Sequence, residues 1–430
     1  MGMILKQDLL QFKGKLRPCR PIYQVALLIS FLLVSFPSSA VQVEGLFSAE
    51  VGVYDRSTEQ RLEGIRQALE KVLVKVSGNR NVIFVPDIIP SDNEIERLVE
   101  QFGYSEIVQD EQEQLTDEVV DDLLGVETEI VTTTDELSAD ATDEVELQPT
   151  LKLWVGFDST AVLRRLQQAN LPVWDKTRPL VLVWLAVQEG GERYLLEPEL
   201  HYDIKEIIEE QAAERGMPIV FPLMDLEDRT FLTASDVWGD FSAPIKQASK
   251  RYGADAILVV RLSDEGDSFW RTQWTLYHGD EANHWDSQGD SHAQTLTDGV
   301  HNSVDTLARR YAQVLLANLE PPLSMILHGV NHFEDYAKAV NYLEGLTQIA
   351  SLNVFRVVRN KVEFNLSIRG SLEGLERVIR LGGILAKVDV EVAPQIPEIV
   401  EDPFTQEVIS VDSLAQQRPS EKVLVYRLLP

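Results

Sequence analysis

Carboxylates gather in two short stretches near the middle of the chain, "PLMDLEDRT" and "SDVWGDF". The residues that stand out there are Asp225, Glu227, Asp228, Asp236, Trp238 and Asp240. Both stretches follow an expected strand, "MPIVFPL", and open α/β sheets collect ligands at the carboxyl ends of their strands. Two carboxylates could divide the acid–base work of glycoside cleavage. Asp and Ser also cap helices and form turns, so caps, packing or partner contact are the other interpretations.

A second candidate is the basic hook "SGNR", which contains Asn79 and Arg80. Phosphate-binding glycine loops precede a helix, where free N–H groups and the positive end of the dipole attract anions. This hook instead follows a helix that we expect to end at Gly78, where free carbonyls point outward. We therefore expect Asn79 and Arg80 to satisfy those carbonyls, with ligand contact as the alternative.

The histidines and tryptophans give weaker signals. His328 and His332 are four residues apart, but they straddle an expected strand end and helix start, so they do not share a helical face as two metal ligands would. Trp270 and Trp274 lie on one face of an expected strand, where core pairing is favoured over sugar stacking. The sequence has no Walker, dinucleotide or G-x-S-x-G motif, and we expect neither a metal nor a cofactor.

The first folded block that must position these residues is an N-terminal α/β domain, 41–175. It opens with an alternating strand in "VQVEGLFSAEVGV", followed by a helix that Ser57 caps and an apolar stripe at helical spacing extends. An acidic run, 105–150, interrupts the block with sixteen Asp and Glu residues and no Lys or Arg. Such a run is typical of a disordered insertion. The strand "LKLWVGF" and a helix from Ser159 follow it.

Two further blocks complete the chain. The order β-α-β-α-β-β-β-α over 178–320 predicts a mixed-sheet α/β domain, whose strands "RPLVLVWLAV" and "ADAILVVRL" are apolar enough to be covered on both faces. The order βαββαβ over 321–392 predicts a ferredoxin-like unit. A Pro- and acid-rich tail, 393–430, ends in an expected edge strand, "KVLVYRL". The predicted fold class is therefore α/β and α+β, in several domains.

The first forty residues are expected to be a signal peptide, 1–40. Five basic residues precede the apolar run Val25–Phe36, and Ser38 and Ala40 occupy the positions that a signal peptidase reads. Twelve residues are fewer than the roughly 20 that a membrane span needs, and retention as an anchor is the alternative. Cleavage would also remove Cys19, the only cysteine. We expect a soluble periplasmic protein without a membrane span after cleavage.

The charge balance excludes one class of partner. The chain has 69 acidic and 39 basic residues, a net charge of −30 at pH 7. A surface of that sign repels the phosphates of nucleic acids and the headgroups of anionic lipids. Nucleic acid is therefore not an expected partner. The expected partners are envelope proteins, in keeping with the expected export of the chain.

Several stretches together carry a family resemblance. "VEGLFSAEV", "VLVKVSGNR", "RPLVLVWLA", "FPLMDLED", "DVWGDF" and "YGADAILVVRL" resemble an uncharacterised gammaproteobacterial family, domain of unknown function 2066, over about 43–391. The middle block, with Gly253-Ala254-Asp255 between a helix and a strand, also looks like the amino-terminal domain of TolB. The second resemblance implies an envelope scaffold that binds proteins without catalysis.

Two functional hypotheses follow. The first is an exported, non-catalytic envelope protein that acts by protein–protein contact, with Asn79, Arg80, Asp225, Asp228, Asp236 and Trp238 as candidate contact residues. The second is an exported hydrolase of envelope glycan that uses the carboxylates of 225–240.

Overall fold

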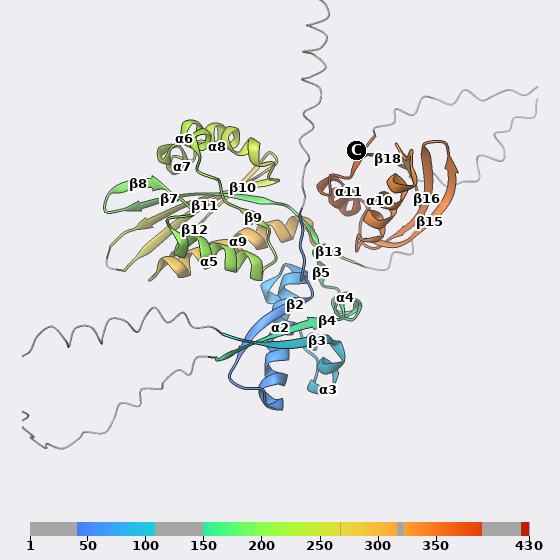
Figure 1. The fold of residues 1–430 in the computed structure, drawn as a ribbon, viewed down its shortest axis with the longest axis horizontal. Coiled ribbons are helices and arrows are strands. Elements are labelled where there is room, and N and C mark those ends of the chain that lie inside the picture. The colour runs from blue at the N-terminus through green and yellow to red at the C-terminus, as the bar shows by residue number, and fades with distance from the viewer. Residues whose placement is uncertain (1–40, 108–148, 267, 316–321, 389–422, 430) are drawn as a thin grey trace, which may run out of the picture. The chain divides into compact units, whose positions relative to one another are not determined.

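The computed structural model describes residues 41–107, 149–266, 268–315, 322–388 and 423–429 (Figure 1). The expected signal peptide and most of the acidic insertion therefore lie outside the described residues. All described residues belong to one compact unit. No helix within the described ranges combines the length and the apolar character needed to cross a membrane. Mixed helices and sheets confirm the α/β and α+β fold class.

The N-terminal domain is a three-stranded antiparallel sheet, in the order β2-β4-β3, that packs against a long helix. Its elements are β1 (Val41–Gln42), β2 (Ser48–Val53), α2 (Thr58–Ser77), α3 (Asp92–Ile95), β3 (Val99–Glu106), β4 (Leu151–Phe157), α4 (Ser159–Gln168) and β5 (Pro172–Val173). The predicted apolar stripe of α2 is buried, and the side chain of Ser57 accepts a hydrogen bond from the backbone N–H of Gln60 at 3.3 Å, which confirms the predicted cap.

The predicted start of the acidic insertion, residue 105, is wrong, because the strand before it extends to Glu106. Ser105 and Glu106 belong to β3, where they pair with Lys152 and Leu151 of β4. The strand is an edge strand and is largely exposed, so its sequence lacks the alternation of buried apolar residues that would have identified it.

The middle domain has a six-stranded mixed sheet with helices on both faces. Its elements are β6 (Thr177–Arg178), β7 (Val181–Glu189), β8 (Glu192–Leu195), α5 (Tyr202–Glu214), β9 (Ile219–Val220), α6 (Leu226–Phe231), α7 (Ala234–Trp238), α8 (Ser242–Ser249), β10 (Ala256–Asp264), β11 (Trp270–His278), β12 (Glu281–Gly289), α9 (His292–Tyr311) and β13 (Gln313–Val314). Strand order is β12-β11-β10-β7-β8, and β9 also pairs with β7.

Burial on both faces explains the near-continuous apolar sequence of β7. Val181, Val183 and Leu185 lie in the core with α5 and α9, whereas Leu182 and Trp184 lie in the opposite core with α7 and α8. Figure 1 shows α5 and α9 on one side of the sheet and α6, α7 and α8 on the other. The strand was predicted from this pattern, and the prediction is confirmed.

The C-terminal domain has the predicted βαββαβ order. Its elements are β14 (Leu323–His328), α10 (Phe333–Glu344), β15 (Ile349–Val358), β16 (Lys361–Ile368), α11 (Leu372–Leu381), β17 (Leu385–Lys387) and β18 (Val423–Leu428). The hairpin turn falls at Arg359 and Asn360, as predicted, because Val358 pairs with Lys361.

The last strand of the chain was wrongly expected at an edge. β18 lies between β14, with which it is parallel, and β17, with which it is antiparallel. Leu424 and Tyr426 are buried there in the core. The alternating sequence "VLVYRL" is compatible with this interior position in the sheet. It does not predict the position, because the same alternation also fits an edge strand.

Candidate functional site

The carboxylates of "PLMDLEDRT" surround one arginine. Asp225 is the N-cap of α6, and its Oδ1 accepts hydrogen bonds from the backbone N–H groups of Glu227 and Asp228 at 3.0 Å. The same carboxylate accepts hydrogen bonds from both terminal nitrogens of Arg251, at 2.8 and 2.9 Å. The hydrogen bonds from Arg251 and from the backbone lower the pKa of Asp225 to about 2. This side chain is therefore an anion held by a cation.

Asp228 is 1% exposed, and its hydrogen bonds fix the loop before α6. Its Oδ2 accepts from the backbone N–H of Met224 at 3.0 Å and from the Tyr252 hydroxyl at 2.5 Å, while Oδ1 lies 3.2 Å from Arg251. Burial, followed by the bond to Asp228, raises the pKa of Tyr252 to about 12. We call Asp225, Asp228, Arg251 and Tyr252 the bracing network.

The other candidates of this region are also occupied. Asp236 forms a capping box with Thr233 at the start of α7, and Trp238 stacks against the guanidinium of Arg193, 4.5 Å from the ring centroid. Asp240 accepts hydrogen bonds from the hydroxyls of Thr275 and Tyr277 at 2.7 and 2.8 Å. These contacts are those of helix caps and packing, and the lowered pKa of Asp225 does not suit this side chain to the role of general acid in a glycosidase, which needs a raised pKa.

The loop fixed by the bracing network carries two exposed apolar side chains, which the sequence analysis did not identify. Leu223 is 72% exposed and Leu226 is 83% exposed, one on each side of Met224 and Asp225. Met224 has a φ of 53°, a left-handed conformation that costs about 1–2 kcal/mol outside glycine. A leucine gives no site signal in a sequence, and the exposure is visible only in the fold.

The hook at Asn79 and Arg80 lies where α2 meets α9. Arg80 does not bind the helix carbonyls, so that expectation was wrong: its Nη2 lies 2.8 Å from Oδ2 of Asp305 on α9. The side chain of Asn79 accepts from the backbone N–H of Asn81 at 3.0 Å and so caps the following turn. Gly78 has a φ of 69°, and a Cβ there would lie 2.5 Å from Ala308 of α9.

The carbonyls at the end of α2 are satisfied by residues from beyond the N-terminal domain's sheet. Nη2 of Arg178 donates to the carbonyl of Lys75 at 2.7 Å, and Nη2 of Arg215 donates to that of Gly78 at 3.2 Å. The backbone N–H of Trp174 donates to the carbonyl of Val76 at 2.8 Å. The prediction is wrong because a sequence shows only which cations are near along the chain, whereas Arg178 and Arg215 of the middle domain lie near these carbonyls in space.

Arg178 joins two helix ends. It is fully buried, its Nη1 donates to the carbonyls of Arg215 and Gly216 after α5, and its guanidinium lies 4.1 Å from the centroid of Trp174. Burial lowers the pKa of Arg178 to about 9, so the side chain stays charged at pH 7. Asp175, 1% exposed, accepts from the backbone and hydroxyl of Thr347 in the C-terminal domain, at 2.9 and 2.6 Å. We call residues 174–178 the junction segment.

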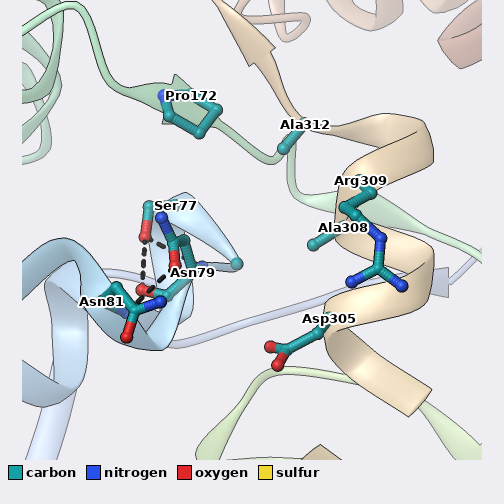
Figure 2. Close-up of a pocket in the computed structure, with 9 residues that line it drawn as sticks. Ser77, Asn79, Asn81, Pro172, Asp305, Ala308, Arg309 and Ala312 are labelled. Atoms are coloured by element: carbon teal, nitrogen blue, oxygen red, sulfur yellow. Dashed lines mark hydrogen bonds between the residues drawn. The ribbon is translucent and has the colours of Figure 1, made fainter. Parts of the chain in front are cut away.

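A cavity of about 390 Å³ lies beside the hook. Figure 2 shows the residues that line it, which are Ser77, Gly78, Asn79, Asn81, Pro172, Asp305, Ala308, Arg309 and Ala312. The polar groups of its hook side bond to one another: the Ser77 hydroxyl donates to the Asn79 carbonyl at 3.3 Å and accepts from the Asn79 N–H at 3.1 Å. These groups bond to one another within the turn, and the side chains of Asp305 and Arg309 on α9 line the opposite side of the cavity.

The remaining aromatic and histidine expectations have simple outcomes. Trp274 is fully buried and stacks on Trp285 of the neighbouring strand, with ring centroids 6.2 Å apart, which confirms core pairing. His328 ends β14 and His332 precedes α10. Across the described ranges, no group of three or more His, Cys, Asp and Glu is arranged to hold a metal ion.

Comparison with known proteins finds a family match for the N-terminal part of the chain. No curated protein matches it. A solved structure titled "Crystal structure of uncharacterized protein" is 12% identical, covers 31% of this chain and 91% of its own, and has a TM-score of 0.15, too low to carry an argument. The expected membership of domain of unknown function 2066 is wrong, because the family model that matches is that of a different domain of unknown function. Residues 40–175 match the family described as "Domain of unknown function (DUF8605)".

Proposed function

We propose that this chain is an exported, non-catalytic protein that acts in the cell envelope by contact with a partner protein, through Leu223 and Leu226. The observation that carries the proposal is the exposure of both leucines on a loop whose backbone is fixed by buried charge. Export rests on the leader, and the scaffold-like role agrees with the resemblance of the middle domain to TolB, which stays a prediction.

The physical argument concerns the entropy of binding. A flexible loop loses conformational freedom when it docks, and this loss weakens affinity. Here Asp228 already holds the N–H of Met224, and Arg229 already donates to the Met224 carbonyl at 2.8 Å. Strained left-handed residues persist where the surroundings hold them, and they cluster at functional sites. The loop is therefore organised before a partner arrives.

The partner that fits is a protein with an apolar groove and a basic rim. Leu223 and Leu226 would enter the groove, and Glu227, which lies between Leu226 and Asp228 and is 56% exposed, would face the rim. The net charge of −30 favours a basic partner at long range as well.

Site-specific photo-crosslinking in cells tests the proposal. A photoreactive amino acid at position 226 is expected to give one adduct of discrete mass, and the same amino acid at Glu192, an exposed position on β8, is expected to give none. Equal adduct patterns at the two positions would contradict the proposal. Release of sugar from envelope glycan by the purified protein would overturn it and favour the hydrolase.

A further inference from the structure

Among the described residues, strand β15 forms an edge of the C-terminal sheet that no other strand covers. The strand runs for ten residues, Ile349–Val358, and within the described residues it pairs with β16 alone. Figure 1 shows it as the outermost strand, beside β16. An edge strand carries a row of N–H and C=O groups without a partner, and natural proteins protect such edges or use them to bind another strand.

Several apolar side chains of β15 are exposed to solvent. Val354, Phe355, Val357 and Val358 are 44%, 67%, 61% and 46% exposed. Val354 and Val357 pair with Phe364 and Val362 of β16, both of which are buried. Directly opposed residues share a face of the sheet, so the apolar core face continues onto β15, where the described residues leave it exposed. A register shift between Val354 and Arg356 leaves Phe355 as the extra residue of a bulge.

The charge of this edge is opposite to that of the chain. Arg356 lies on β15, Arg359 in the turn and Lys361 at the start of β16, and 349–361 contains no Asp or Glu. Glu363 of β16 lies 2.7 Å from Arg356 and offsets one of these charges. No ion pair engages Arg359 or Lys361 in the part of the chain that the structure describes. A basic, apolar edge on a chain of net charge −30 is complementary to a segment that alternates acidic and apolar residues.

We propose that β15 binds an extended, acidic–apolar segment of a partner protein as an added strand. The segment would take its main-chain hydrogen bonds from the free edge, place apolar side chains on Val354 and Val357, and place carboxylates near Arg359 and Lys361. This surface lies in a different domain from Leu223 and Leu226, so the inference goes beyond the proposed function, and either one can fail alone.

A peptide that can pair through one edge only is the probe. We would use a fluorescent octapeptide of alternating Glu and Val with every second amide N-methylated, and a matching Lys–Val peptide, against the full chain. The acidic peptide should bind, and hydrogen exchange should slow at the amides of 352–358 but not along β12, which is an edge strand of the middle sheet. Equal affinity for the two peptides, or no slowing in β15, would overturn the inference.

Two variants sharpen the test. R359E/K361E should weaken binding of the acidic peptide about fivefold to tenfold and strengthen binding of the basic one, since two exposed charge pairs are reversed. V357T keeps the shape of the side chain and should weaken both. If the amides of 352–358 are already protected without peptide, or if V357T abolishes a dimer of the chain, the edge has another occupant and the inference fails.

Discussion

Arg215 shows how one buried side chain can fix the protonation state of its neighbour. The residue is 2% exposed, with Nη2 2.8 Å from Oδ1 of Asp305 and Nη1 3.0 Å from Nδ1 of His301. An arginine only donates hydrogen bonds, so Nδ1 of His301 must accept, and the ring is neutral with its proton on Nε2. Burial, followed by the charges of Arg215 and Arg80, lowers the pKa of His301.

This arrangement predicts a loss of stability in mild acid. Because the folded pKa of His301 is below the unfolded value of about 6.5, the unfolded chain binds the proton more readily. The contribution of His301 to the free energy of unfolding is thus complete above pH 6.5 and falls as the pH drops toward the folded pKa. Urea unfolding at pH 7.5 and pH 5 should show this loss, with a smaller loss in H301Q, whose amide oxygen still accepts from Arg215.

The control for this prediction is H284Q, because His284 is 60% exposed on β12. His278 contributes in the same direction, since burial lowers its pKa too, so H301Q should reduce the pH dependence without removing it. An unchanged difference between pH 7.5 and pH 5 in H301Q would contradict the prediction.

The bracing network yields a second prediction at this scale. D228N keeps one oxygen, which can take the place of Oδ2 and accept from Met224 and Tyr252, but it removes the negative charge and directs an NH₂ group at Arg251 where Oδ1 accepts. The loss of a buried, charge-assisted acceptor is expected to lower the free energy of unfolding by about 1–3 kcal/mol. Photo-crosslinking at position 226 should become weaker or heterogeneous, since the loop is no longer fixed. D236N at the exposed capping box of α7 is the matched control and should retain the crosslink.

Single residues were predictable where their role is local. Asp225 and Asp236 cap helices, and caps act within three residues of sequence, so the pattern predicted that interpretation. Arg178 and Arg215 could not be found in this way. Among the partners of each are carbonyls more than thirty positions away in sequence, and a carbonyl is present at every residue, so no residue type identifies it.

At the scale of elements, α9 and β11 show why a helix interior contains glycine. A Cβ at Gly299 would lie 1.8 Å from Cε2 of Trp274, so the indole packs directly on the helix backbone. Trp274 is fully buried and stacked on Trp285, which leaves it no room to move. Glycine in a helix costs about 1 kcal/mol relative to alanine, and this contact is the compensation.

We therefore expect G299A to destabilise the protein, although alanine is the better helix former. Overpacking of a core costs about 1–3 kcal/mol, more than the helix propensity returns. G103A on β3 is the control, because a Cβ there meets nothing within 4 Å. Chemical denaturation of both variants checks the prediction, and equal or higher stability of G299A would show that Trp274 can move.

Elements were predictable in proportion to their burial. Strand β7 and helix α2 bury long apolar patterns, and both were predicted within a few residues. Strand β3 is exposed and was missed, and β8, with exposed and half-buried residues, was missed for the same reason. The place of β18 inside its sheet depends on β14, which lies almost a hundred positions earlier, and local alternation contains no information about that partner.

For the whole molecule, the junction segment determines how the domains are coupled. Arg178 holds the ends of α2 and α5, one from each of two domains, and Asp175 holds Thr347 of the third. Arg80, Asp305 and Arg215 add a chain of charges between the hook and α9. The predicted boundary between the N-terminal and middle domains, 175 to 178, falls within this segment. The structure contains two buried charges at this point, Arg178 at 0% and Asp175 at 1% exposure.

R178M should therefore weaken the association of the N-terminal domain with the middle domain. The variant has a similar volume but leaves the carbonyls of Lys75, Arg215 and Gly216 without their donor. We expect a loss of about 3–5 kcal/mol, the cost of breaking a buried charged network, and calorimetry should resolve separate transitions where the parent protein unfolds more cooperatively. R164M, at an exposed position on α4, is the control and should match the parent. Were R178M as stable and as cooperative as R164M, the domains would have to be held together by contacts other than this arginine.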